Sequence, residues 1–81
     1  MNSEEIFREI QSVIEDICNI SKSEIHMESS IMEDLDLSSL EIISVISKLQ
    51  KVFSIRIAAS EINEISDVSD LVSLIKEKID L

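Results

Sequence analysis

Apolar side chains near the start of the chain recur every three or four residues, a spacing that places them on one face of an α-helix. The positions are Ile6, Ile10, Val13, Ile14 and Ile17. Asn2 and Glu5 have the spacing of a capping box at the beginning of such a helix. Asn19 suits the left-handed conformation that often ends one, in a chain without glycine. We therefore expect a first helix from Asn2 or Ser3 to Ile17.

Residues 20–37 show no sustained period and are rich in Ser, Glu and Asp. Ile25, Ile31 and Leu35 are spaced along it as isolated apolar anchors. A long connection without helices or strands in a compact domain is usually functional or disordered, and the anchors favour function. We expect an ordered, functional loop here.

The segment Ser38-Ser39-Leu40-Glu41 has the pattern of a second capping box, and a broad apolar face follows it. Ser38 is the expected N-cap, and Ser39 opens the first turn. The apolar positions are Leu40, Ile42, Ile43, Ile46, Leu49 and Phe53. The pattern predicts a second helix that ends near Phe53 or Ser54.

Residues 54–59 alternate weakly, and because no partner strand lies nearby we expect an extended connection. Ile62 and Ile65 fit a short helical turn near residues 60–65, and Ser66 or Asp67 caps a last helix. That helix carries Val68, Leu71, Val72, Ile75 and Ile79. Together the elements predict an all-α fold. It is a small three-to-four-helix bundle with a long loop between helices one and two, formed as a single domain over residues 1–81.

Composition narrows the choice of partners and compartment. The 81 residues carry a net charge of -10, which repels nucleic-acid phosphates and anionic membranes and favours basic protein surfaces. Cys18 is the sole cysteine, the N-terminus lacks the features of a signal sequence, and no apolar run approaches a membrane span. We expect a cytoplasmic monomer that neither binds nucleic acid nor inserts into a membrane.

The side chains needed for most catalytic sites are scarce. The chain has one His, one Cys and no Gly, which argues against an enzyme and against a phosphate-cradling loop. We interpret His26 as an ordinary surface histidine and Cys18 as buried filler in the first helix. Asp34, Asp36 and Ser38 imitate the start of a calcium loop, but Ser39 and Val45 stand where such a loop needs Gly and Glu. Weak divalent binding by Glu33, Asp34 and Asp36 leaves a metal-binding regulator as an alternative, and we predict no dedicated metal site.

The run from Glu33 to Glu41, EDLDLSSLE, resembles the modification site of the acyl carrier protein family, whose pattern is broadly E-D-L-x-x-D-S-L followed by an acid. The resemblance extends over nearly the whole chain. It implies that Ser39 is the residue joined covalently to 4′-phosphopantetheine, derived from coenzyme A. Leu35 and Leu40 fix this register and select Ser39 over Ser38. Two residues depart from the pattern: Ser38 replaces an acid, and Asp36 stands where the family often has Gly.

By this resemblance the protein shuttles thioester-linked acyl intermediates between enzymes of fatty-acid, polyketide or related lipid synthesis. The implied partners are a phosphopantetheinyl transferase and acyl-transferring and condensing enzymes with basic docking surfaces, which recognise Asp34, Asp36, Leu40 and Glu41. The second helix is poorer in acid than the family's usual recognition helix and carries Lys48 and Lys51. A specialised carrier for a dedicated pathway is one hypothesis. The alternatives are an aminoacyl or peptidyl carrier and a non-modified interaction domain of the same fold.

Overall fold

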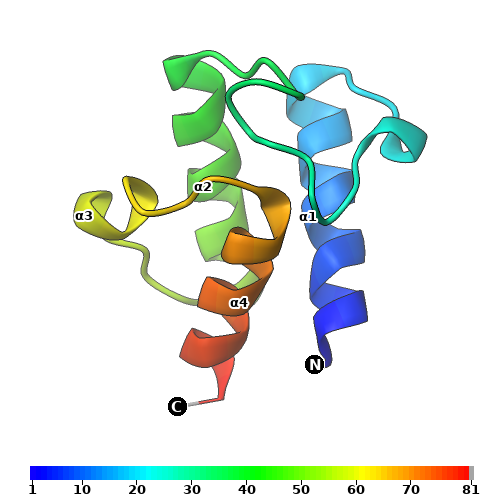
Figure 1. The fold of residues 1–81 in the computed structure, drawn as a ribbon. Coiled ribbons are helices and arrows are strands. Elements are labelled where there is room, and N and C mark those ends of the chain that lie inside the picture. The colour runs from blue at the N-terminus through cyan, green and yellow to red at the C-terminus, as the bar shows by residue number, and fades with distance from the viewer. Residues whose placement is uncertain (81) are drawn as a thin grey trace.

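The computed structural model describes residues 1–80, and these form an all-helical fold, as the sequence predicts. The elements in chain order are α1 (Ser3–Cys18), the 3-10 turn η1 (Lys22–Glu24), α2 (Ser39–Phe53), α3 (Ala59–Ile62) and α4 (Val68–Ile79). A long loop joins η1 to α2 across one end of the bundle (Figure 1). The predicted bundle with a long first connection is confirmed.

The predicted caps of α1, Asn2 and Asn19, are also confirmed. The Asn2 side chain accepts a hydrogen bond from the Glu5 N–H at 2.8 Å, and the Asn2 N–H donates to Glu5 Oε1 at 3.1 Å. Asn19 has φ 58° and ψ 38°, the left-handed conformation expected of it, and its N–H donates to the Glu15 carbonyl. The helix extends one residue beyond the expected Ile17, to Cys18.

A third capping box begins α4, and its N-cap is Asp67, one of the two caps that the sequence predicts. Asp67 accepts from the Asp70 N–H at 2.9 Å, and the Asp70 carboxylate accepts from the N–H groups of Ser66 and Asp67. The Ser69 hydroxyl donates to Asp67 at 2.6 Å, and this bond with those from backbone N–H groups lowers the pKa of the Asp67 carboxyl. A carboxylate at this end also suits the positive end of the helix dipole.

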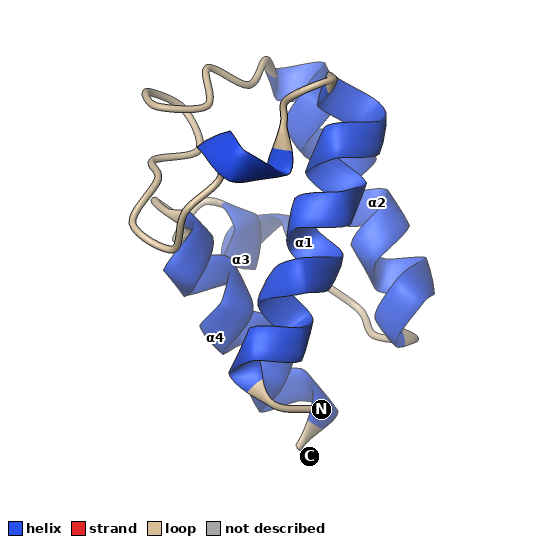
Figure 2. Cartoon of the chain, turned by 90° about the vertical axis from the view of Figure 1, so that its right-hand side faces the viewer, coloured by secondary structure: helices blue, strands red, loops and turns tan. Residues whose placement is uncertain are grey.

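The core lies between α1, α2 and α4, with α1 packed against both of the others (Figure 2). Nearly all of it is Ile, Leu and Val, as the scarcity of aromatic residues requires. α1 supplies Ile6, Ile10, Val13 and Ile14; α2 supplies Val45, Ile46 and Leu49; α4 supplies Val68, Leu71, Val72 and Ile75. Near the start of α1, Lys76 of α4 donates to the Met1 carbonyl at 3.4 Å. The first turn of α2 lies at the opposite end of the bundle (Figure 1).

The loop after α1 is ordered by burial and by hydrogen bonds to α4. The predicted anchors Ile25, Ile31 and Leu35 are buried, and Leu37 joins them. The backbone pairs with the start of α4, since the Ile31 N–H donates to the Ser66 carbonyl at 3.0 Å and the Val68 N–H to the Ser29 carbonyl at 3.1 Å. These contacts fix the path of the chain into α2.

Candidate functional site

Two neighbouring serines at the start of α2 have different roles. Ser38 is the N-cap: its hydroxyl accepts from the Glu41 N–H at 3.2 Å, and its own N–H donates to Glu41 Oε1 at 2.9 Å. Ser39 is the first residue of the helix and is exposed. Among residues 1–80 the Ser39 hydroxyl has no hydrogen-bond partner. The predicted cap is therefore present, and it occupies Ser38 while leaving the Ser39 hydroxyl open to solvent.

The same turn favours a negative group on Ser39. The N–H groups of Ser39 and Leu40 occupy the first two helical positions, where no carbonyl of the helix can accept from them. Together with the helix dipole they create a positive potential at the surface. A phosphodiester on the Ser39 hydroxyl fits this environment in charge, and its exposure admits a modifying enzyme.

The Glu41 carboxylate of this cap and the Cys18 thiol at the end of α1 affect each other's pKa. The hydrogen bond from the Ser38 N–H, then that from the Ser38 side chain, and to a smaller extent one from the Cys18 thiol lower the pKa of the Glu41 carboxyl. Partial burial, and then the nearby Glu41 carboxylate, raise the pKa of the Cys18 thiol. Cys18, interpreted from the sequence as buried filler, is instead half-buried and packs against the core rather than lying within it. Glu41, expected to recognise partners, is held chiefly by its role in the cap.

Asp34 and Asp36, the two aspartates predicted to recognise partners, have different structural roles. The Asp34 carboxylate accepts from the Ser30 N–H at 2.7 Å, so it closes a turn of the loop as well as facing solvent. Asp36 is exposed and has φ 51°, in the left-handed region. Glycine adopts this conformation without strain and Asp tolerates it better than most residues. The left-handed conformation explains why the family often has Gly at the position that Asp36 occupies here.

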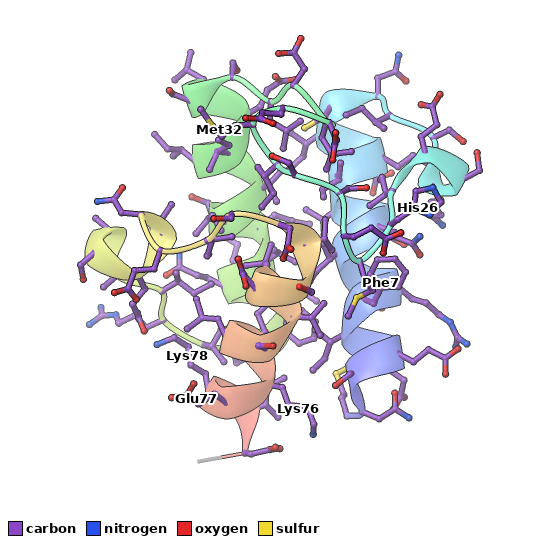
Figure 3. All side chains as sticks on the ribbon, in the orientation of Figure 1. Phe7, His26, Met32, Lys76, Glu77 and Lys78 are labelled. Carbon is purple, nitrogen blue, oxygen red and sulfur yellow. The ribbon has the colours of Figure 1, made fainter. Side chains whose placement is uncertain are left out.

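An apolar groove of about 370 Å³ lies beside Ser39. Its walls come from the loop, α2, and the segment around α3: Ile31, Met32, Ser39, Ile42, Ile43, Ile46, Ile62, Asn63 and Ile65. Met32 is 60% exposed and Ile43 57% exposed, and Figure 3 shows Met32 beside the first turns of α2. No motif in the sequence predicts this groove. The available signal was the broad apolar face of α2, which includes Ile42, Ile43 and Ile46.

Comparison with known proteins assigns this chain to a family. The family model for the phosphopantetheine attachment site matches residues 8–75. The chain belongs to the acyl carrier protein family. An acyl carrier protein of Petrotoga mobilis is 27% identical over 81 residues, covering 100% of this chain and 95% of that protein. An acyl carrier protein of Coprothermobacter proteolyticus is 34% identical over 53 residues, which span 65% of each chain.

Membership of the acyl carrier protein family confirms the predicted cofactor, because the matched domain is the attachment site of covalent 4′-phosphopantetheine. A carrier presents a bound group and does not itself catalyse, in agreement with the expectation that the chain is not an enzyme. Ser39 as the acceptor, and Asp34, Asp36, Leu40 and Glu41 as recognition residues, stay predictions. The structure brings all five to one end of the bundle, with Leu40 77% exposed directly after Ser39.

Other candidate chemistry lies away from this carrier site. His26 is exposed on the loop just after η1, on the far side of the bundle from Met32 (Figure 3). Among residues 1–80, no three His, Cys, Asp or Glu side chains come together in a way that could hold a metal ion. In the same residues no helix has the length and apolar character needed to span a membrane.

Proposed function

We propose that this protein is an acyl carrier protein that bears 4′-phosphopantetheine on Ser39. It presents thioester-linked acyl intermediates to successive enzymes of fatty-acid, polyketide or related lipid synthesis. The observation that carries the proposal is the exposed Ser39 hydroxyl at the first position of α2, inside the matched region. When attached, the group supplies a terminal thiol that forms the thioester, and the chain supplies its position.

The cap supports Ser39 over Ser38 as the acceptor. The Ser38 hydroxyl accepts the hydrogen bond of the Glu41 N–H, so a phosphodiester there would disturb the start of the helix. Losing such a cap costs about 1 kcal/mol. Modification at Ser39 leaves the Ser38 cap intact and places the phosphate against free N–H groups.

The groove beside Ser39 supports an acyl cargo over an aminoacyl one. Its lining is apolar except for Ser39 and Asn63, so it offers no carboxylate to an amino group. Its volume lies near the lower end of the range for ligand sites, about 300–1,000 Å³. Each methylene buried there contributes about 0.8 kcal/mol. An eight-carbon acyl thioester is therefore expected to raise Tm above that of the acetyl form, whereas a glycyl thioester leaves Tm close to the acetyl value.

The expected partners follow from this role. A phosphopantetheinyl transferase and the acyl-transferring and condensing enzymes meet the turn around Ser39, where Leu40 offers an apolar contact. Asp34 and Asp36 add exposed negative charge that suits basic docking surfaces at this end of the bundle. The protein acts as a single cytoplasmic domain.

The test is intact-mass measurement after incubation with coenzyme A and a broad-specificity phosphopantetheinyl transferase. The wild-type chain and Ser38→Ala should each gain the mass of one phosphopantetheine, and Ser39→Ala should gain none. A wild-type chain that gains no mass would support the non-modified interaction domain. Modification of Ser39→Ala but not of Ser38→Ala would assign the acceptor to Ser38 and overturn the choice of residue.

A further inference from the structure

α2 presents a continuous exposed ridge that begins next to Ser39. Leu40, Ser44, Ser47 and Lys51 follow one another at spacings of four, three and four residues, which aligns them along one helical face, and all four are exposed. The ridge is apolar at its start, where Leu40 is 77% exposed. It is small and polar in its middle and cationic at its end, where Lys48 is also exposed.

The charge of this ridge is opposite to that of the molecule. Between Glu41 and Glu61 the chain has no carboxylate side chain, although the whole protein has 17 acidic residues and a net charge of -10. The cations of this interval are Lys48, Lys51 and Arg56, and all are exposed. Glu41 does not offset them, because its carboxylate is held in the cap at the other end of α2.

The remaining cations of the protein are used within the fold. Arg8 pairs with Glu4 at 2.9 Å, Lys22 with Glu15 at 3.9 Å, Lys76 with Asp80 at 3.1 Å, and Lys78 with Glu61 at 3.0 Å. Within the part of the chain that the structure describes, Lys48, Lys51 and Arg56 form no ion pair. The helix dipole accounts for a cation in the last turn, which contains Lys51, but not for Lys48. The fold therefore leaves these charges without an internal partner.

We propose that α2 docks on an enzyme surface whose charge is negative, with carboxylates that face Lys48 and Lys51 and an apolar pocket that receives Leu40. This inference rests on the proposed carrier function and names the chemistry of one class of partner. The cations lie about 14 and 18 Å along the helix axis from Ser39 at 1.5 Å per residue. The partner's carboxylates thus lie well away from the active-site entrance that admits the phosphopantetheine arm. At the end of the contact near Ser39 the carrier is instead negative, because Asp34 and Asp36 lie there. A surface with two signs fixes the orientation of the docked carrier.

The test uses a purified malonyl-transferring enzyme with Arg and Lys side chains around its active-site entrance. A distal-Glu variant of this enzyme keeps those side chains and carries Glu at surface positions about 14–18 Å from the entrance, the distance at which Lys48 and Lys51 lie from Ser39 along α2. The measured quantity is kcat/KM for malonyl transfer to the holo-carrier. Wild-type carrier should favour the distal-Glu variant over the parent enzyme. The double variant Lys48→Glu with Lys51→Glu should reverse this preference, changing the ratio by at least about tenfold, within the range of electrostatic steering.

The matched control is Arg8→Glu with Lys22→Glu, which lowers the net charge equally on the surface of α1 and η1 and should leave the preference of the wild type in place. The preference should vanish at about 1 M salt, where the Debye length is about 3 Å. A wild-type carrier that does not favour the distal-Glu variant, or equal effects of the two double variants, overturns the inference.

Two further outcomes would also overturn it. A dimer that sediments at low salt and is lost in the Lys48→Glu, Lys51→Glu variant would show that the ridge binds a second copy. Binding to phosphatidylglycerol vesicles, lost in the same variant, would assign it to a membrane surface. Intact mass separates the two proposals: without an attached arm both fall, whereas a loaded carrier that lacks the charge preference defeats the docking inference alone.

Discussion

α1 and α2 have nearly equal lengths, 16 and 15 residues, and each begins with a reciprocal capping box, yet they expose different surfaces. α1 exposes charged side chains that find partners within the fold, such as Arg8 with Glu4. α2 exposes Leu40 and Ile43 and carries cations without ion-pair partners in residues 1–80. Since the same local rules build both helices, the difference lies in their outer faces: Arg8 of α1 pairs within the fold, whereas the exposed face of α2 fits the proposed docking on another molecule.

The comparison is tested most strongly by removing the same side chain from each helix. Ile10 in α1 is 0% exposed, whereas Ile43 in α2 is 57% exposed. Ile10→Ala should lower the free energy of unfolding by about 2–5 kcal/mol, because it removes buried methylenes and leaves a cavity. Ile43→Ala should cost less than about 1 kcal/mol. Urea denaturation followed by circular dichroism measures both, and similar losses would contradict the assignment of Ile43 to an outer surface.

The caps provide a second contrast, with smaller effects. Asn2→Ala and Ser38→Ala should each lower stability by about 1 kcal/mol, because each leaves a first-turn N–H without its acceptor. Ser38→Asp should retain most of the stability, since Asp caps as well as Ser. Thermal denaturation checks all three. If Ser38→Asp is no more stable than Ser38→Ala, the Ser38 hydroxyl is not acting as a cap.

The helices could be predicted from sequence because their signals are local. The spacing of Asn2 and Glu5, and of Ser38 and Glu41, each lies within four residues, and the structure confirms both caps. The groove could not be predicted in the same way. It forms only when Ile31 of the loop, Ile46 of α2 and Ile62 of α3 meet, and no local pattern relates these segments.

The loop shows the same limit. Its anchors were visible as isolated apolar residues, but its pairing with α4 through Ser29 and Ile31 is a long-range contact. The left-handed backbone of Asp36 was not predicted, and its one available signal was a resemblance to a position at which the family often has Gly. The unusual charge of α2 was readable directly, because Lys48 and Lys51 fall in a stretch without carboxylates. The sequence alone did not show that the other cations form ion pairs.

Acid should weaken the start of α2. Hydrogen bonds from the Ser38 N–H and side chain lower the pKa of the Glu41 carboxyl in the folded protein. A carboxyl whose pKa is lowered by folding stabilises the fold at pH values above its pKa in the unfolded chain, which is about 4.3 for Glu. This contribution is lost as the pH falls through the lower pKa of the folded state. Tm of the wild type should therefore fall below about pH 4.3, and Glu41→Gln should show a shallower fall. Identical pH profiles for the two proteins would contradict the linkage.

The smallest effect concerns the cations themselves. Arg8→Ala removes an exposed pair at i and i+4 and should cost about 0.3–0.5 kcal/mol at low salt. Lys48→Ala removes a cation that has no ion-pair partner in residues 1–80 and should change stability by less than this. The difference should shrink as salt screens the Arg8 pair. Paired urea titrations at about 10 mM and about 1 M NaCl resolve it, because the Debye length falls from about 30 to about 3 Å. If Lys48→Ala loses as much stability as Arg8→Ala at low salt, Lys48 serves the fold, and the case for reserving the end of α2 for a partner is lost.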